Sequence, residues 1–337
     1  MTILLGIFIF GMLIFVHELG HFLVARAFHV RVHAFSIGMG PAIFKKTKGE
    51  VEYSLRLLPI GGYVKLEGED TESDDPNAFC RKKPFERLCV LLAGGVMNII
   101  TGFLIFLILF SSVSAIRVPV VDSVVENTPA ASAGIMAGDR IIRINNKSIH
   151  IQNDVSLAML KNGAKELEIT VLRNGEKITK NLTPKSDDAS GSYIIGFYSK
   201  MQEMTPGLAI KTAFYNTAFS AEVVYYSVGQ MLTGGVKLKD MSGPVGIVDE
   251  MNNVAKSEMP VLNMLNFMAM IAVNLGIMNL LPIPALDGGR IFFILFEMIR
   301  RKPIKPEHEG LVHFIGLALL LLLMVVITFS DITKLFA

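Results

Sequence analysis

Residues 2–28 read TILLGIFIFGMLIFVHELGHFLVARAF. This stretch is free of charge through residue 16 and then places two histidines and a glutamate inside an apolar run. A helix needs about 20 apolar residues to cross a bilayer core of roughly 30 Å, so the segment spans only if the helix continues through His17, Glu18 and His21. Ionisable side chains are costly inside a membrane and usually serve a function there. The stretch therefore predicts a membrane helix with chemistry in its second half.

A cleaved signal peptide is the alternative interpretation of this first segment. A signal peptide begins with a basic region and ends at a small-residue cleavage site. Neither feature is present, because Met1 is followed by Thr2 and Ile3 and no such site follows the apolar stretch. We therefore expect the helix to be retained.

Three further segments lack Asp, Glu, Lys and Arg, at 88–116, 259–286 and 311–330, and His313 is the only ionisable residue of the last one. The composition agrees, since 51% of the 337 residues are hydrophobic and 18% are charged, whereas soluble domains carry about 25% charged residues. The net charge of +2 argues against a nucleic-acid partner. The two cysteines, Cys80 and Cys89, cannot make a disulfide framework. The chain is thus expected to be a polytopic α-helical membrane protein with about four transmembrane helices.

Basic residues predict the orientation of these helices. Region 29–87 is rich in Lys and Arg, and a second basic cluster precedes the last apolar segment. Positive charges near span ends mark the cytoplasmic side, and four spans would place both basic regions on that side. The N-terminus, the C-terminus and residues 117–258 would then lie outside the cytoplasm. The second cluster consists of Arg300, Arg301, Lys302 and Lys305.

The charged residues of the first segment form the motif His-Glu-x-x-His. His17 and His21 share one face of a helix because they are four residues apart, and two imidazoles so placed can ligate Zn²⁺. Glu18 would lie beside the metal, where it can take a proton from a metal-bound water. The alternative is a polar trio that is satisfied within a helix bundle.

A catalytic zinc site usually has three protein ligands and one open position. Asp287 is the best third ligand, within the run NLLPIPALDGG at 279–289. The first and third segments run in the same direction, and His17 lies about 24 Å along a helix from Met1. Both residues are therefore expected near the cytoplasmic surface. His313, near the start of the last segment, is the alternative third ligand.

The region between the second and third segments contains a small β-rich domain. Its β-like runs are at 118–121, 140–144, 167–172 and 177–182, with a hairpin turn, RNGE, at 173–176. The stretch ENTPAASAGIMAGDRII at 126–142 resembles a bacterial PDZ domain. A PDZ-like fold binds an extended segment by strand addition; the alternative is a β-rich spacer that binds nothing.

The motif HELGH at 17–21, together with the Asn-x-x-Pro-x-Pro-x-Leu-Asp-Gly run, resembles the site-2 protease family of intramembrane zinc metalloproteases, of the bacterial RseP type. The order of features is similar along nearly the whole chain. The resemblance implies that His17, His21 and Asp287 are the zinc ligands and that Glu18 is the catalytic base. Many Gram-negative members carry two tandem PDZ domains, whereas the space between the second and third segments here fits one.

The same resemblance implies a substrate class and a location. Members cut single-span membrane proteins within or near the bilayer, often after a first extracytoplasmic cut. Pre-cut anti-sigma factors and remnant signal peptides are the substrates that it implies. The location would be the bacterial cytoplasmic (inner) membrane, with the PDZ-like domain outside and the active site toward the cytoplasm.

Further matches to this family concern substrate contact. The run AGGVMN at 93–98 ends in Asn98 and resembles a small-residue motif of the family, although small residues also permit close helix packing. Asn274 and Asn279 match polar positions near the substrate, or they satisfy backbone groups freed by the nearby prolines. The run RLLPIGGYVKL at 56–66 resembles a membrane-associated β-hairpin, whose Gly61 and Gly62 would present an edge to substrate. An ordinary cytoplasmic hairpin is the alternative there.

The expected organisation follows from these segments. It comprises a first transmembrane helix with the His-Glu-x-x-His motif at 1–28, a cytoplasmic loop with a β-hairpin at 29–87, a second transmembrane helix at 88–116, a PDZ-like α+β domain at 117–200, an amphipathic connecting region at 201–258, a third transmembrane segment at 259–299, a cytoplasmic loop at 300–310 and a fourth transmembrane helix at 311–337. Residues 205–235 lie on a surface or form a fifth span. The run SGPVGI at 242–247 resembles a turn of the family, but the sequence assigns it no role.

The alternative function is a metal-binding membrane scaffold or transporter, and a third is a PDZ adaptor with a degenerate protease part. Metal binding needs His17, His21 and Asp287, whereas hydrolysis also needs a base such as Glu18. A transporter would carry polar residues through the full depth of the bilayer. The polar intramembrane residues here are expected near one side, which favours the protease.

Overall fold

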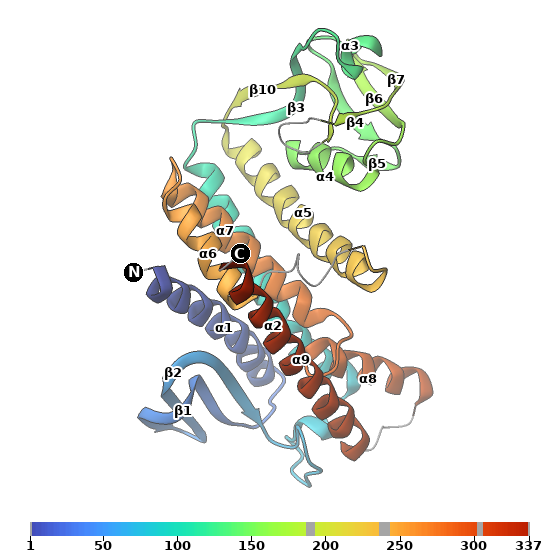
Figure 1. Cartoon of the computed structure of the whole chain (residues 1–337). Coiled ribbons are helices and arrows are strands. Elements are labelled where there is room, and N and C mark those ends of the chain that lie inside the picture. The colour runs from blue at the N-terminus through green and yellow to red at the C-terminus, as the bar shows by residue number, and fades with distance from the viewer. Residues whose placement is uncertain (1, 187–192, 236–242, 302–305, 336–337) are drawn as a thin grey trace. The chain divides into compact units, whose positions relative to one another are not determined.

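The computed structural model describes residues 2–186, 193–235, 243–301 and 306–335 (Figure 1). Within these residues, four helices are long and apolar enough to cross a membrane. They are α1 (Thr2–Ala27), α2 (Pro84–Ser111), α7 (Pro260–Leu280) and α9 (Pro306–Leu335). The protein is a polytopic membrane protein with a β-rich region inserted between α2 and α7, as the sequence predicts. Lys302, Lys305 and Ser242 lie outside the described residues.

The chain divides into two compact units. One comprises Met1–Ile105 and Ser220–Ala337, and the other comprises Phe106–Phe219. The first unit contains the apolar helices that carry the motif residues, and the second contains the inserted sheet.

Glycines bring α1, α2 and α7 into close contact. A Cβ at Gly20 of α1 would lie 2.5 Å from the carbonyl oxygen of Ala93 in α2. A Cβ at Gly95 of α2 would lie 2.9 Å from the carbonyl oxygen of Gly276 in α7. Small residues allow this approach in membrane helices, where packing and not the hydrophobic effect holds helices together. The small-residue run at 93–98 therefore packs α2 between the other two helices.

The second apolar segment begins earlier than its charge-free part suggests. Helix α2 starts at Pro84, which favours a first helical position because it has no N–H to satisfy there. Its first turns thus include Glu86 and Arg87, and Arg87 pairs with Glu297 at 2.6 Å. The helix ends at Ser111, and strand β3 begins at Ala115.

The third apolar segment consists of two helices instead of one. Helix α7 ends at Leu280, and α8 (Asp287–Arg300) begins after six intervening residues. Pro282 and Pro284 lie between them, and proline cannot continue a helix because it lacks the N–H and clashes with the preceding turn. The break places Asp287 at the first residue of α8. A shorter helix, α6 (Pro244–Ala255), precedes α7 and packs on α1 and α7.

The N-terminal hairpin is larger than the run at 56–66 suggests. Strand β1 (Val32–Lys48) pairs with β2 (Val51–Leu66), and both strands bend so that they form four antiparallel segments. Segment 32–37 lies between 52–55 and 62–66, and segment 42–48 pairs with 51–56. Residues 62–66 therefore form one edge of this sheet. A short 3₁₀ helix (Phe79–Arg81) follows before α2.

The inserted unit is a mixed α and β domain with its own core. Its main sheet has the order β10-β3-β4-β6-β7, and β5 pairs with β4. The core side chains are aliphatic, among them Ile141, Leu167 and Ile169. The strands are β3 (Ala115–Val124), β4 (Arg140–Ile144), β5 (Lys147–Ser148), β6 (Leu167–Arg173), β7 (Glu176–Leu182), β8 (Lys185–Ser186), β9 (Tyr193–Ile194) and β10 (Phe197–Glu203), and the helices are α3 (Pro129–Ser132) and α4 (Gln152–Asn162). Helix α5 (Pro206–Leu232) begins in this unit and belongs to the first unit from Ser220 onward.

The four β-like runs of the sequence are confirmed as β3, β4, β6 and β7. The hairpin turn at 173–176 is confirmed too, because Arg173 pairs with Glu176 in the ladder. Asn174 and Gly175 both have positive φ, at 51° and 88°. That combination is the one that two-residue hairpin turns require.

A buried ion pair ties two turns of the inserted domain together. Asp139 is fully buried, and Arg173 donates to both of its carboxylate oxygens at 2.7 and 2.8 Å. Burial alone would raise the pKa of Asp139, but hydrogen bonds from Arg173 and from the Met136 N–H lower that pKa below its ordinary value. The charged carboxylate therefore stabilises the fold above its unfolded-state pKa of about 4. This stabilisation is lost as the pH falls through the lower folded-state value.

We expect Asp139→Ala to lower the free energy of unfolding of this domain by about 1–3 kcal/mol at pH 7, because it leaves buried donors unpaired. The difference from the unaltered chain should shrink below about pH 4. Hydrogen exchange of β4 and β6 in the intact protein, corrected for the intrinsic rate at each pH, measures this. Glu176→Ala, at an exposed carboxylate, is the matched control. Equal protection in the two variants at pH 7 would contradict the prediction.

Candidate metal centre

Helix α1 turns His17 and His21 toward the same point. Their Nε2 atoms are 3.2 Å apart, and each residue is 9% exposed. The Oδ2 atom of Asp287 lies 3.1 Å from Nε2 of His17 and 3.3 Å from Nε2 of His21. The break between α7 and α8 thus brings to α1 a carboxylate that is more than 260 residues away in sequence.

These three side chains have the chemistry of a metal centre. One ligand atom from each lies within 4.8 Å of the other two, and they are the candidate metal-binding group among the described residues. Oδ2 of Asp287 is buried, and the polar atoms beside it are the two imidazole nitrogens. Two imidazole nitrogens and a carboxylate oxygen match a catalytic zinc site with an open fourth position. The residues present therefore fit Zn²⁺.

Both histidines have partners on their second ring nitrogen. Nδ1 of His21 lies 2.8 Å from the carbonyl oxygen of Val90, so it carries the proton and leaves Nε2 free for a metal. The side-chain amide of Asn279 lies 3.4 Å from Nδ1 of His17. Asn279, which the sequence places near substrate, contacts a candidate metal ligand in the structure.

Glu18 is not part of the three-residue group and faces the hairpin. Its carboxylate accepts a hydrogen bond from the backbone N–H of Val64, in the edge segment of β2. A Cβ at Gly62 would lie 3.1 Å from Cγ of Glu18 and 2.9 Å from the carbonyl oxygen of Ser36. Gly61 has φ +84°, a conformation that glycine adopts at little cost. Residues 62–64 of this edge therefore lie directly beside Glu18.

The other sequence-predicted site residues lie outside this group. Asn98 in α2 is 1% exposed, and its Oδ1 has no hydrogen-bond partner among the described residues. Asn274 is half-buried in α7. His313, the alternative third ligand, accepts a hydrogen bond from the Ala285 N–H at 2.9 Å.

Gly94 is a site residue whose role the sequence analysis missed. A Cβ there would lie 2.4 Å from Nε2 of His21 and 2.7 Å from Cε1 of His17. The small-residue run at 93–98 was the signal, but it could not show that one glycine faces the imidazoles while its neighbour packs against α7. Glycine at this position leaves the space that the metal centre needs.

Comparison with known proteins decides the family. The profile of Peptidase family M50 matches residues 5–323. The chain belongs to peptidase family M50, the site-2 protease family. A protein of Clostridium acetobutylicum named as a zinc metalloprotease is 40% identical to this M50 chain. The alignment covers 98% of the M50 chain and 97% of the relative.

Two further M50 relatives are the zinc metalloprotease RasP of Bacillus licheniformis, 32% identical, and the regulator of sigma-W protease RasP of Bacillus subtilis, 31% identical. Each alignment covers 99% of both chains. The M50 protein is therefore a multi-pass, zinc-dependent intramembrane metalloprotease of the site-2 type. The family resemblance of the sequence is confirmed.

Proposed function

We propose that His17, His21 and Asp287 hold the zinc ion and that Glu18 is the general base. The observation that carries this proposal is the convergence of the three ligand atoms within 4.8 Å. Bound zinc supplies a Lewis acid that polarises a peptide carbonyl and acidifies water. The carbonyl oxygen of Val90 orients the His21 imidazole by accepting its Nδ1 proton.

Glu18 lies between the histidines and the edge of β2. An extended peptide paired with that edge would have its scissile bond next to Glu18. Glu18 accepts a proton from the attacking water and delivers it to the leaving amine nitrogen. The hydrogen bond from Val64 orients the carboxylate before substrate binds. Val64 thus belongs to the proposed binding edge and also contacts the proposed base, so pairing of a substrate strand with this edge would bring its peptide bond close to Glu18.

The substrate strand pairs with the edge segment of β2 near Gly61 and Gly62. Glycine at these positions lets Met39 and Glu18 pack closely against the backbone of this edge. A helical peptide bond is shielded by its own hydrogen bonds, so the substrate helix must unwind first. Asn98 and Asn274 are secondary candidates for contact with the unwound segment.

The hairpin is proposed to be associated with the membrane. Large apolar side chains are exposed along its bent part, which is unusual for a soluble hairpin. Contact with lipid would cover them. They are Met39, Ile43, Phe44, Leu55, Leu57 and Leu58.

The metal centre is proposed to face the cytoplasmic side of the bacterial inner membrane. The helix ends near the metal centre carry basic residues, namely Arg26 in the last turn of α1, Arg87 in the first turns of α2 and Arg300 at the end of α8. Positive charge near span ends marks the cytoplasmic side. The inserted domain, which we propose to be PDZ-like, would then lie outside and filter substrates.

The proposed substrates are single-span membrane proteins that have lost their extracytoplasmic domain, such as anti-sigma factors or remnant signal peptides. The name of the Bacillus subtilis relative, a regulator of sigma-W protease, supports the first class. One inserted domain makes a smaller filter than two would. We still expect it to exclude a bulky outer domain.

Cleavage in liposomes tests this proposal. We expect the reconstituted protein to cut a tagged single-span substrate that lacks its outer domain and to cut the intact substrate at least about tenfold more slowly. Removal of zinc with a chelator should stop cleavage, and added zinc should restore it, because zinc supplies the Lewis acid. Equal rates on the two substrates would reject the filter. Cleavage that survives zinc removal would reject the metal mechanism.

A further inference from the structure

The turn that delivers Asp287 to the histidines has an unfavourable backbone. Residues 283–286 form a turn closed by a hydrogen bond from the Leu286 N–H to the carbonyl oxygen of Ile283, at 3.2 Å. Pro284 occupies the second position, and Ala285 occupies the third with φ +74°. This is the arrangement of a type II turn, in which the third position normally requires glycine or asparagine. An alanine there needs support from its surroundings.

His313 of α9 supplies that support. Its Nδ1 accepts the hydrogen bond from the Ala285 N–H at 2.9 Å, and its side chain is 14% exposed. The neutral ring must therefore carry its proton on Nε2. Gly289 leaves room for the ring, because a Cβ there would lie 3.2 Å from Cε1 of His313.

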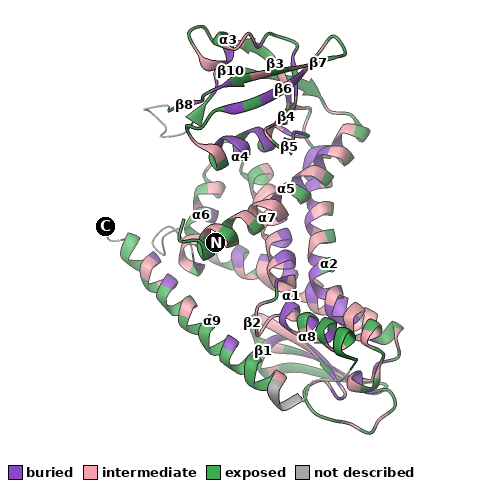
Figure 2. Cartoon of the chain, turned by 90° about the vertical axis from the view of Figure 1, so that its right-hand side faces the viewer, coloured by how far each residue is buried: buried purple, intermediate pink, exposed green. Residues whose placement is uncertain are grey.

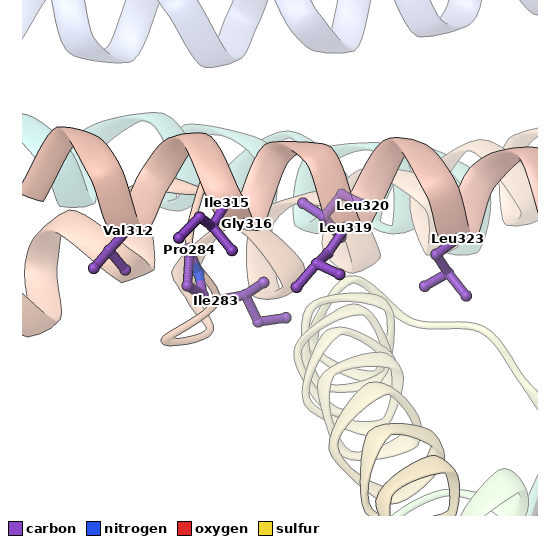
Figure 3. A pocket seen from close by; sticks show the side chains of 8 residues that line it. All are labelled: Ile283, Pro284, Val312, Ile315, Gly316, Leu319, Leu320 and Leu323. Carbon is purple, nitrogen blue, oxygen red and sulfur yellow. The ribbon is translucent and has the colours of Figure 1, made fainter.

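Helix α9 also touches the turn directly, one helical turn beyond His313. A Cβ at Gly316 would lie 2.3 Å from Cβ of Pro284 and 2.8 Å from its carbonyl carbon. Figure 3 shows Pro284 against this face of α9, where Gly316 lies between Val312 and Leu319. Glycine is required because any side chain would push the helix away from the turn.

The remainder of α9 is exposed on most of its surface, as Figure 2 shows. Its inward stripe begins at His313 and ends at Asp331, about 27 Å along the helix. Asp331 is 3% exposed and accepts hydrogen bonds from the N–H groups of Gly243 and Gly246 at the start of α6, at 2.7 and 2.9 Å. This contact gives the run at 242–247 a structural role. The two polar ends thus attach α9 to two different elements.

We propose that His313 is a positioning residue for the metal centre. By holding the 283–286 turn, it sets where α8 begins and so directs Oδ2 of Asp287 toward His17 and His21. It does so without joining the three-residue metal group. The inference rests on the proposed role of Asp287 as a zinc ligand. Helix α9 would then position a metal ligand in addition to spanning the membrane.

The test measures zinc affinity of the intact protein in lipid nanodiscs by competition with a chelator. We expect His313→Leu to lower the affinity about 10–100-fold, as loss of a group that orients a metal ligand typically does. The absorption spectrum of the cobalt(II)-substituted protein should shift as well, because the carboxylate is displaced. His313→Asn should restore most of the affinity, because its Oδ1 can accept the Ala285 N–H in place of Nδ1.

Asp331→Ala is the matched control. It breaks the attachment of α9 at the other end, so it should lower the thermal unfolding temperature but leave zinc affinity and the cobalt spectrum unchanged. Gly316→Ala keeps His313 but drives α9 from Pro284, so it should weaken zinc binding even if His313→Leu fails to fold.

Asp287→Ala separates this inference from the proposed function. Loss of zinc in Asp287→Ala with normal affinity in His313→Leu and Gly316→Ala would overturn the role of His313 alone. Normal zinc affinity in Asp287→Ala would overturn the ligand assignment itself. Equal losses in His313→Leu and His313→Asn would also overturn the inference, because the missing acceptor could not then be the cause.

Discussion

Glu18→Gln should leave zinc bound and lower the rate of substrate cleavage by about 10²–10⁴-fold, the usual contribution of a general base. The amide has nearly the same shape and can still accept the hydrogen bond from the Val64 N–H. It cannot take a proton from water. Because Glu18 is outside the group of three ligand atoms, its neutralisation should not release the metal.

The measurement is cleavage of a trimmed single-span substrate in liposomes, with bound zinc determined on the same samples. Glu297→Gln is the matched control, since it also neutralises a partly buried carboxylate of the same unit, one that pairs with Arg87. It should retain cleavage. A Glu18→Gln protein that cuts at the normal rate would remove Glu18 from the mechanism. Loss of zinc from it would instead make Glu18 part of the metal centre.

Gly94→Ala should abolish cleavage by a different route, through loss of the metal. The added methyl would lie 2.4 Å from Nε2 of His21, well inside van der Waals contact. Helix α2 cannot move aside easily, because Ala93 contacts Gly20 on one side and Gly95 contacts Gly276 on the other. We expect zinc affinity to fall by at least about 10–100-fold, and cleavage with it.

Zinc content after dialysis against a weak chelator measures this effect. Gly229→Ala in α5 is the matched control, because a Cβ there meets nothing within 4 Å. Alanine at that helical site should be neutral or stabilise the helix by up to about 1 kcal/mol. If Gly94→Ala binds zinc as the unaltered chain does, α1 and α2 must lie farther apart than in this structure.

The sequence predicts the chemistry well because the decisive residues are local. His17, Glu18 and His21 lie within two turns of one helix, and a helix of known period determines which of them share a face. Charge-free segments predict the membrane helices for a similar reason, since hydropathy is a property of single residues summed along the chain. Asp287 was identifiable because the segments that carry it and the histidines run in the same direction.

Other features depend on contacts between elements that are far apart in sequence. The bent pairing of β1 and β2 places residues 62–66 at an edge beside Glu18, and no local pattern determines that register. The sequence leaves Asn279 either near substrate or bonded to backbone groups freed by the prolines, and it gives no sign that the Nδ2 of Asn279 lies 3.4 Å from Nδ1 of His17. His313 looked like a possible ligand because histidine binds metals, but its Nδ1 accepts a backbone N–H instead.

The sequence by itself determined that this protein is a membrane metalloprotease with a two-histidine helix and a distant carboxylate. Hydropathy and motif spacing predict the membrane helices and the candidate ligands, and the proteolytic reaction is what the resemblance to the site-2 protease family implies. Only the tertiary structure decided which small and polar residues make the centre possible. Gly94, Gly316 and His313 act through the space or the hydrogen bond that they provide to a neighbouring element. A missing Cβ or a free ring nitrogen has meaning only once the neighbour is in place, because close packing is a property of pairs of elements.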